Sequence, residues 1–338
     1  MNKSLRTIFQ YIFFLGLGIF FAWLSLKNLN SDKIAQIKIA IHNAKHWLII
    51  PVFGILILSH FVRALRWRLL MEPLGYNPSK INTFFAVMIG YLTNQAVPRL
   101  GEVLKCTILA RYEKIPADKL IGTIILERII DAITLLIIFG ITLAIQPHLY
   151  QQLLGAFFSA PENQEEKKTA TWIIILIILT LIFIVIGFWM YLKKKKVSDF
   201  ISLIKKTIQR IVLGITSVRH LKKRSYFIFL TFTLWSLYLS GGYLGFMALQ
   251  ETSHYGIKEA FTVLSAGSIG MIASPGGIGA YAYLLQQTMQ LYGLNEAIAL
   301  AFGWILWLAQ TAVILIAGLI SFVALPFYNK KKIQSERS

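Results

Sequence analysis

The stretch that decides the fold is residues 91–131, YLTNQAVPRLGEVLKCTILARYEKIPADKLIGTIILERIID. It places Pro98, Gly101 and several charged residues inside otherwise apolar sequence. Charges are costly where a helix crosses lipid, so they need a reason. A broken helix at membrane depth is tolerated only where protein or a water-filled cavity satisfies the freed backbone groups. The stretch therefore predicts a broken or re-entrant helix beside a charged cluster. The charged residues that we assign to it are Arg99, Glu102, Lys105, Glu127, Arg128 and Asp131.

The composition indicates an all-α polytopic membrane protein. Hydrophobic residues make up 56% of the 338 residues and charged residues 14%. The apolar runs are roughly 17 to 25 residues long, which is the length that a helix needs to cross a bilayer core. The net charge of +19 would suggest nucleic acid as the partner of a soluble protein. Cytoplasmic loops of membrane proteins are rich in Lys and Arg, so we expect no nucleic acid and some contact with anionic lipid.

Metal, cofactor and nucleophile signals are absent from the sequence. Cys106 is the single cysteine, so neither an intrachain disulfide nor a thiolate metal cluster is expected. The six histidines do not show metal-binding spacing, and the glycines at 276–279 lie outside any βαβ unit. We therefore expect no metal, no cofactor, no catalytic residue and no enzymatic activity. Residues 8–26 are interpreted as a retained anchor helix.

Basic residues set the predicted topology. The N-terminus, residues 193–196 and residues 330–332 are basic, which predicts that both termini are cytoplasmic. Residues 81–97 are long enough to span, but a crossing there would place the basic residues up to Lys119 outside. We therefore predict a hairpin that enters and leaves on the cytoplasmic side, although two full crossings at one hairpin are an alternative. The predicted crossings are 8–26, 47–65, 120–145, 171–192, 226–249 and 297–326, and the predicted re-entrant hairpins are 81–112 and 258–291.

The two halves of the chain follow the same order. Helix 47–65, hairpin 81–112 and helix 120–145 match helix 226–249, hairpin 258–291 and helix 297–326 in the opposite orientation. Inverted repeats with broken helices are typical of transporters, whose substrate site lies where the breaks meet. One transmembrane domain, 1–330, is expected. It comprises a first half at 8–192, a basic cytoplasmic linker at 193–224 and a second half at 226–326, with a disordered tail at 331–338. Residues 27–46 predict an amphipathic helix on the outer surface.

The charged residues permit two interpretations. In the structural one, cations neutralise Glu102, Glu127 and Asp131 and fix the hairpin to the following helix, because buried charges in membranes are usually paired. In the functional one, the cluster lines a hydrated cavity where Arg99, with a second cation, holds a phosphate. Arg63 likewise has two interpretations. It either anchors the cytoplasmic end of its helix, or it forms part of a basic entrance for an anionic headgroup. The predicted headgroup or cavity residues are Arg63, Arg66, Arg99, Glu102, Lys105, Glu127, Arg128 and Asp131, and the helix-break residues are Pro98, Gly101, Pro275, Gly276, Gly277 and Gly279.

Three segments carry a family resemblance: VPRLGEVLK at 97–105, IPADKLIGTIILERIID at 115–131 and SPGGIGAYAYLL at 274–285. In this order and spacing they resemble the lysylphosphatidylglycerol synthase transmembrane-region family of flippase-like membrane proteins, over about residues 8–325. The resemblance implies a multi-pass protein of a bacterial or archaeal cell membrane, related to the flippase half of proteins that make and translocate aminoacylated phosphatidylglycerol. It does not imply lysyl transfer, because the synthase half is a separate soluble domain.

Carried over by motif, the resemblance points to named positions. In the family a glutamate often follows the glycine turn, and Ala282 occupies that place here. A proton-coupling or headgroup role of that glutamate is therefore not implied for this chain. The positions implied are Pro98, Arg99, Gly101, Glu102, Glu127, Arg128, Asp131, Pro275, Gly276, Gly277 and Gly279.

The sequence favours one function over two others. The favoured function is translocation or binding of an anionic membrane lipid, either a phospholipid or a polyprenyl-phosphate-linked lipid, through the charged intramembrane cavity. The alternative is a membrane scaffold or accessory subunit of an envelope-lipid enzyme, which would act through the basic segment 193–224. A membrane-embedded enzyme fits least, because only scattered carboxylates are available for catalysis. The sequence carries no signal for an oligomeric state.

Overall fold

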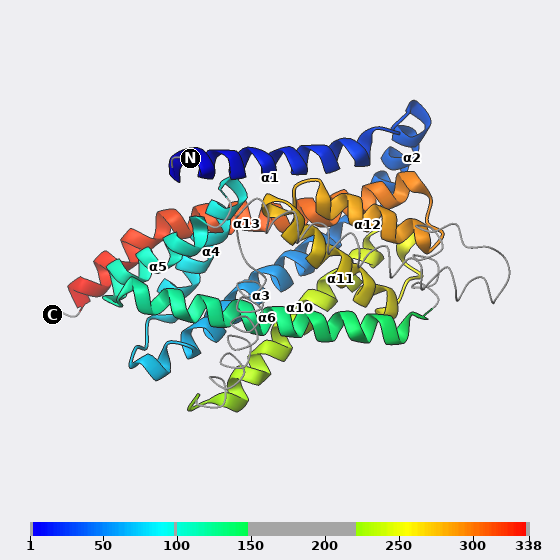
Figure 1. Ribbon diagram of the computed structural model, residues 1–338. Coiled ribbons are helices and arrows are strands. Elements are labelled where there is room, and N and C mark those ends of the chain that lie inside the picture. The colour runs from blue at the N-terminus through cyan, green and yellow to red at the C-terminus, as the bar shows by residue number, and fades with distance from the viewer. Residues whose placement is uncertain (1–2, 98–99, 148–220, 336–338) are drawn as a thin grey trace, which may run out of the picture. The chain divides into compact units, whose positions relative to one another are not determined.

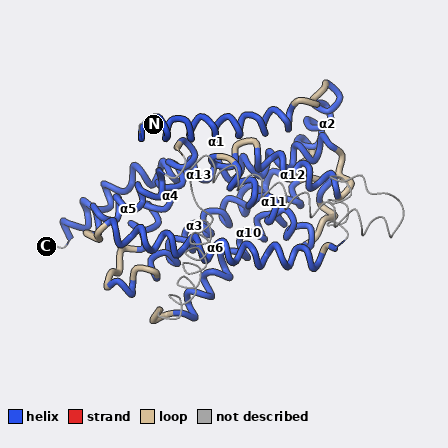
Figure 2. Tube along the Cα trace, viewed as in Figure 1, coloured by secondary structure: helices blue, strands red, loops and turns tan. Residues whose placement is uncertain are grey.

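The computed structural model describes residues 3–97, 100–147 and 221–335. Every regular element in these ranges is a helix, and they contain no strand (Figures 1 and 2). Met1–Ile145 and His220–Ser338 form one compact unit. The predicted crossing at 171–192 and nearly all of the predicted linker at 193–224 lie outside the described residues.

The helices of the unit follow the predicted order, in which a long helix, a helical hairpin and a second long helix occur twice. Within the described residues, four helical segments are long and apolar enough to cross a membrane: His46–Leu74, Ala117–Ile145, Arg224–Ala248 and Glu296–Lys330. They coincide with four of the six predicted crossings. The bounds are α1 Lys3–Leu26, α2 Ser31–His42, η1 His46–Leu48, α3 Ile49–Leu69, η2 Glu72–Leu74, α4 Lys80–Ala96, α5 Leu100–Glu113, α6 Ala117–Ile145, α10 Arg224–Ala248, η3 Gln250–Thr252, α11 Ile257–Ala273, η4 Pro275–Gly277, α12 Ala280–Leu291 and α13 Glu296–Ser335.

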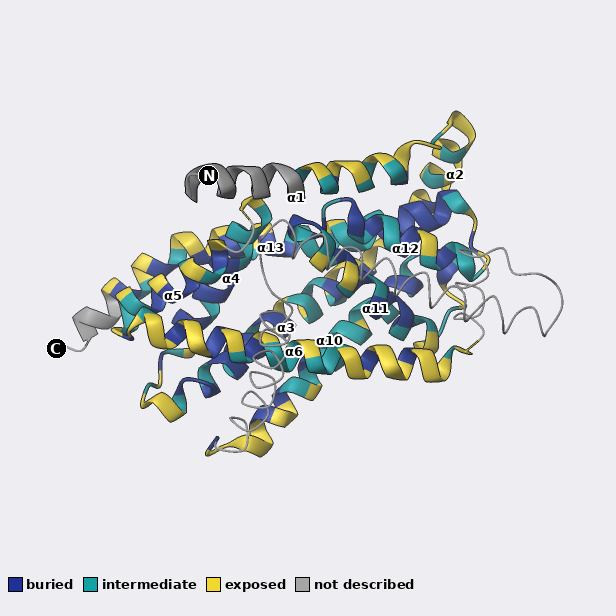
Figure 3. Ribbon diagram, in the orientation of Figure 1, coloured by how far each residue is buried: buried dark blue, intermediate teal, exposed yellow. Residues whose placement is uncertain are grey.

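The outer faces of the long helices are apolar. On α6, Leu136 is 70% exposed, and on α10 Phe232 is 72% exposed, with similar side chains along α13 (Figure 3). A soluble protein rarely exposes contiguous apolar surface on this scale. Helices in a bilayer do so because lipid tails are as apolar as the side chains that they contact. The exposure pattern therefore agrees with a multi-pass membrane protein.

The first predicted hairpin is present as an antiparallel helix pair, α4 and α5. At its open end the amide of Asn82, on α4, donates a hydrogen bond to the Glu113 carboxylate on α5. At its closed end the Gly101 amide donates to Asn94 Oδ1 at 2.8 Å. Gly90 and Gly101 lie where the two backbones come closest, since a Cβ on Gly90 would lie 2.9 Å from the Gly101 carbonyl oxygen. Gly101 therefore lies inside α5, where it permits close packing of α5 against α4. The chain breaks before it, between the end of α4 at Ala96 and the start of α5 at Leu100.

The second hairpin consists of α11 and α12, joined by η4. Gly276, Gly277 and Gly279 have positive φ angles of 57°, 71° and 69°, a region that L side chains rarely occupy. The Ser274 hydroxyl donates to the Ile278 carbonyl at 2.8 Å and closes the turn. At the open end the hydroxyls of Thr262 and Tyr292 lie 2.8 Å apart. These glycines therefore make the sharp break between the two helices.

The tips of the two hairpins meet inside the unit. The Gln95 side chain, at the end of α4, lies directly against Gly276 in η4, where an added Cβ would overlap its amide oxygen. Trp307 of α13 donates from Nε1 to the Gly276 carbonyl at 2.9 Å. The two sequence breaks, far apart along the chain, are therefore neighbours in space.

Several helix contacts in the first half have a counterpart in the second. α3 and α10 run antiparallel: the Lys45 amide, before α3, donates to the Ala248 carbonyl at 2.9 Å, and Lys223, before α10, reaches Glu72 at 3.1 Å. α4 packs on α13 as α11 packs on α6, and α5 packs on α6 as α12 packs on α13. If each helix is replaced by the matching helix of the other half, each of these contacts becomes another contact that is also present.

One segment differs from the sequence-based expectation. α13 continues through Pro326 to Ser335, past residue 331, where the sequence predicts a disordered tail. A proline removes one helical hydrogen bond, but the turn after it is held to α4 by Asn82 and Asn329, whose amides exchange hydrogen bonds of 2.9 Å. α2 forms within the segment where an amphipathic helix is expected, with Ile34 and Ile41 exposed and Ala40 packed into the core.

We expect Gly101→Ala to destabilise the protein and Gly122→Ala to stabilise it. A Cβ at Gly101 would overlap the Gly90 carbonyl, and backbone must then move, which typically costs about 1–3 kcal/mol. Gly122 lies in the middle of a helix with nothing within 4 Å of an added Cβ, so alanine there gains roughly 0.5–1 kcal/mol. Thermal unfolding in detergent measures both changes. Equal melting temperatures for the two variants would contradict the close approach of α4 and α5.

Candidate functional site

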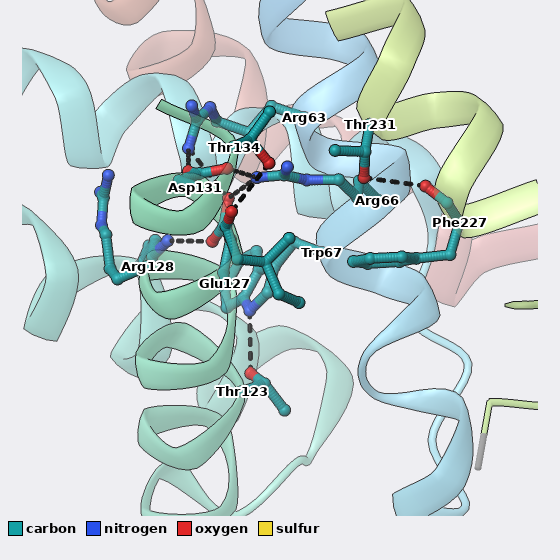
Figure 4. Close-up of polar contacts among 12 residues, drawn as sticks. Arg63, Arg66, Trp67, Thr123, Glu127, Arg128, Asp131, Thr134, Phe227 and Thr231 are labelled. Carbon is teal, nitrogen blue, oxygen red and sulfur yellow. Dashed lines mark hydrogen bonds and ion pairs between the residues drawn. The ribbon is translucent and has the colours of Figure 1, made fainter. Parts of the chain in front are cut away.

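Two arginines of α3 and two carboxylates of α6 form the centre of the site (Figure 4). Arg63 Nη1 lies 3.1 Å from Glu127 Oε1 and 2.8 Å from Asp131 Oδ2. Arg66 Nη2 lies 2.5 Å from Asp131 Oδ1 and 3.4 Å from Glu127 Oε1. Residues three and four apart share a helix face, so each pair points at the other. Each arginine therefore contacts both carboxylates, which fixes all four side chains.

Lys105 adds a third cation from the first hairpin. Its Nζ lies 3.3 Å from Glu127 Oε2 and 4.4 Å from the centre of the Trp67 ring. Trp67 is itself held by a 2.9 Å hydrogen bond from its Nε1 to the hydroxyl of Thr123. The ammonium is therefore stabilised by one carboxylate and one aromatic face, and it connects α5 to α3 and α6.

The cluster carries one more positive charge than negative charge. We call Arg63, Arg66, Lys105, Glu127 and Asp131 the cation cluster, which has three cations and two carboxylates. Arg66 is fully buried, and its Nε and Nη1 have no hydrogen-bond partner in the described part of the chain. An unsatisfied buried donor on a charged group typically costs at least about 1–3 kcal/mol. An anion that accepts from Arg66 would remove this cost and balance the charge.

The cation cluster lies well inside the span. Glu127 and Asp131 follow the start of α6 by 10 and 14 residues, which places them roughly 15 and 21 Å along the helix at about 1.5 Å per residue. A charge at this depth must be paired, hydrated or functional. The pairing within the cluster satisfies both carboxylates, so the remaining question is the role of the extra cation.

Arg128 and Glu102 form a separate pair. Arg128 Nε lies 3.1 Å from Glu102 Oε1, and their side chains are 42% and 34% exposed. The sequence groups Arg128 with its neighbour Glu127, but consecutive helix positions point in different directions. In Figure 4 the Arg128 side chain lies on the left of α6 and Arg66 lies on its right. Of the predicted residues, five thus join the cation cluster and two form this outer pair.

A cleft connects the outer pair to the cation cluster. Its enclosed volume is about 10 Å³, which is room for about one water molecule. Lys105 lines this cleft and also bonds Glu127 of the cluster, so it belongs to both. The residues lining the cleft are Val87, Gly90, Tyr91, Asn94, Gly101, Glu102, Lys105 and Arg128. Its lining therefore brings Lys105 of the cation cluster together with both members of the outer pair.

The remaining predicted residues lie elsewhere. Pro98 and Arg99 are outside the described residues, so the predicted phosphate contact of Arg99 stays a prediction. Pro275 and the three glycines of the second break are at the hairpin tip that contacts α4. Ala282 is fully buried, with its carbonyl 2.5 Å from where a Cβ on Gly303 would lie, so this position packs directly against α13.

Sequence reasoning missed two aromatic contributors. Tyr238 on α10 accepts hydrogen bonds from Arg63 Nε and Nη2 at 3.4 and 3.2 Å, and Tyr91 on α4 lines the cleft. Both are tyrosines in apolar helices, which the sequence alone does not distinguish from ordinary packing residues. In the described ranges, no group of three or more His, Cys, Asp or Glu side chains is arranged to hold a metal ion.

Comparisons with known proteins agree with the family resemblance seen in the sequence. The profile of the family described as "Lysylphosphatidylglycerol synthase TM region" matches residues 9–318. The UPF0104 membrane protein MJ1595 of Methanocaldococcus jannaschii is 29% identical over 128 residues, which is 37% of this chain and 36% of that protein. The match thus spans about a third of the length of this relative. No solved structure matches the chain.

Proposed function

Because the chain belongs to the lysylphosphatidylglycerol synthase transmembrane-region family, we propose that it binds a lipid with an anionic headgroup and moves it across the membrane. The observation that carries the proposal is the uncompensated positive charge of the cation cluster, together with the unpaired nitrogens of Arg66. A phosphate oxygen accepts charge-assisted hydrogen bonds from guanidinium and ammonium groups. The headgroup enters through the cleft at Lys105 while the acyl or polyprenyl tails stay in the bilayer.

The two halves of the unit form an inverted repeat in this proposal. Their corresponding helices have the same order and mirrored packing partners, and α3 runs antiparallel to its counterpart α10. The hairpins α4–α5 and α11–α12 are then re-entrant from opposite sides, and their tips meet at Gln95 and Gly276. Alternating access in such folds moves one repeat against the other around a central site. Displacement of the tips would open the cleft to one leaflet at a time.

The proposal places the Lys119 end of the unit in the cytoplasm. The first turn of α1 and the last turns of α13 lie at one end of the bundle, and α2 lies at the other (Figure 1). Basic residues of the loops around α5 and before α10 gather at the end that holds the termini, as cytoplasmic loops require. Labelling of cysteines introduced at Lys38 and Lys119 from either side of a membrane tests this orientation, and labelling of Lys119 from outside would reverse it.

Liposomes that contain the purified protein test the function. Fluorescent phosphatidylglycerol in the inner leaflet should become accessible to an external quencher at least about tenfold faster than in protein-free liposomes. Phosphatidylcholine, whose choline would bring another cation to the cluster, should move more slowly. A fluorescent polyprenyl phosphate distinguishes the two anionic lipid classes. If a folded protein moved none of these lipids, translocation would be excluded, and a scaffold acting through residues 193–224 would become the better account.

A further inference from the structure

His60 on α3 is a buried titratable side chain that the cation cluster does not use. It is 4% exposed, and neither Nδ1 nor Nε2 has a hydrogen-bond partner among the described residues. A neutral imidazole has one donor and one acceptor, so both capacities are unmet. Buried polar atoms of native proteins are nearly always paired, and an unpaired one needs an explanation. Ionisable groups inside membranes commonly belong to ion or proton pathways.

The position of His60 joins the cleft to the cation cluster. Its ring lies 4.9 Å from the ring of Tyr91, centre to centre, and Tyr91 also lines the cleft. Arg63 follows His60 by three residues, so the two side chains are neighbours on the same helix face. Tyr91 therefore contacts both His60 and the cleft. A protonated His60 would place its charge beside Arg63.

The polar groups around His60 already form hydrogen bonds or ion pairs with one another. Both carboxylates of the cation cluster bond to arginines, and the Tyr238 hydroxyl on α10 bonds to Arg63. The charged residues of α13 that the structure describes lie near its two ends. The charged and titratable groups on the elements around His60 are Arg63 and Arg66 on α3, Tyr91 on α4, Glu127 and Asp131 on α6, and Tyr238 on α10. None of them provides a counter-anion for a protonated His60 in the arrangement seen here.

We propose that His60 binds a proton when an anionic headgroup occupies the cation cluster, so that lipid movement is coupled to proton movement. This inference rests on the function proposed above. One proton passes from water in the cleft to a ring nitrogen, which raises the local charge by one unit and attracts the phosphate more strongly. When the lipid leaves, the imidazolium faces only cations and releases its proton. Linkage is reciprocal: if lipid favours the proton, the proton favours lipid by the same factor.

Proton uptake on lipid binding tests the coupling directly. The full-length protein in weakly buffered detergent is titrated with phosphatidylglycerol, and the change in pH and the amount of bound lipid are recorded together. We expect uptake of about one proton per bound lipid near neutral pH, where a histidine can change its charge. His60→Gln should bind lipid without proton uptake. His60→Phe, which keeps a ring against Tyr91, should behave in the same way, and His42→Gln on exposed α2 should match the wild type.

The affinity of the wild type should also fall by about tenfold or more as the pH rises from 5.5 to 8, while His60→Gln should show a flat profile. Lipid binding by the wild type without proton uptake would overturn the coupling and leave the lipid site intact. Proton uptake that persists in both His60 variants would overturn the role of His60. A wild type that binds no anionic lipid would overturn the proposed function and this inference together.

Discussion

Glu127→Gln is expected to lower the free energy of unfolding by about 3–5 kcal/mol, the range seen when one partner of a buried ion pair is removed. Glu127 contacts Arg63, Arg66 and Lys105, and its side chain is 1% exposed. The glutamine keeps the size of the side chain but leaves three buried cations with only Asp131. Three helices, α3, α5 and α6, lose their shared anion, so the hairpin should also loosen from α6.

Glu102→Gln is the matched control for this substitution. It makes the same chemical change at the exposed pair with Arg128, where a salt bridge typically contributes only about 0–1 kcal/mol. Thermal unfolding of both variants in one detergent, followed by circular dichroism, provides the measurement. Equal melting temperatures for the two variants would mean that the cation cluster does not stabilise the fold.

Lys105→Gln is expected to reduce translocation of phosphatidylglycerol by roughly 10-fold to 100-fold while the protein remains folded. The substitution leaves Arg63 and Arg66 balanced by Glu127 and Asp131, so the core pairing survives. It removes the extra positive charge and the cation that lines the cleft. A hydrogen bond to a charged group contributes about 1.5–3 kcal/mol, which corresponds to this range of rates.

Lys119→Gln is the control for charge alone. This substitution also removes one cation, but Lys119 lies on the surface near Tyr76 and outside the cleft. Melting temperatures must accompany the rates, because a variant that unfolds would lose activity for a different reason. If Lys105→Gln moved phosphatidylglycerol at the wild-type rate, the extra cation would have no part in transport.

Much of the fold was predictable from simple patterns. Long apolar runs identify four helices that are long and apolar enough to cross a membrane, and Pro275 with three glycines identifies the second break. The end of α13 was not predictable in this way, because Pro326 marks a helix end only when no tertiary contact follows it. Here Asn329 bonds to Asn82 of α4, and this contact between distant residues maintains the helix.

The charged site was predictable as a set of residues but not as a geometry. Spacing shows that Glu127 and Asp131 share a face, and the structure joins both to Arg63 and Arg66. Sequence cannot show that Arg128 turns away toward Glu102, because that depends on where the hairpin packs against α6.

Tyr238 and His60 were not predictable as members of the site or its surroundings. Each lies in an apolar helix, and each gains its place only from the packing of α3 with α4 and α10.

The most direct test is the equilibrium affinity of the purified protein for phosphatidylglycerol, measured for the wild type and for Lys105→Gln against phosphatidylcholine as the reference lipid. The account predicts that the wild type prefers phosphatidylglycerol and that Lys105→Gln binds it roughly 10-fold to 100-fold more weakly, with little change for phosphatidylcholine. Equal affinity of the two proteins for phosphatidylglycerol, with both folded, would contradict the claim that the uncompensated cation of the cluster binds an anionic headgroup.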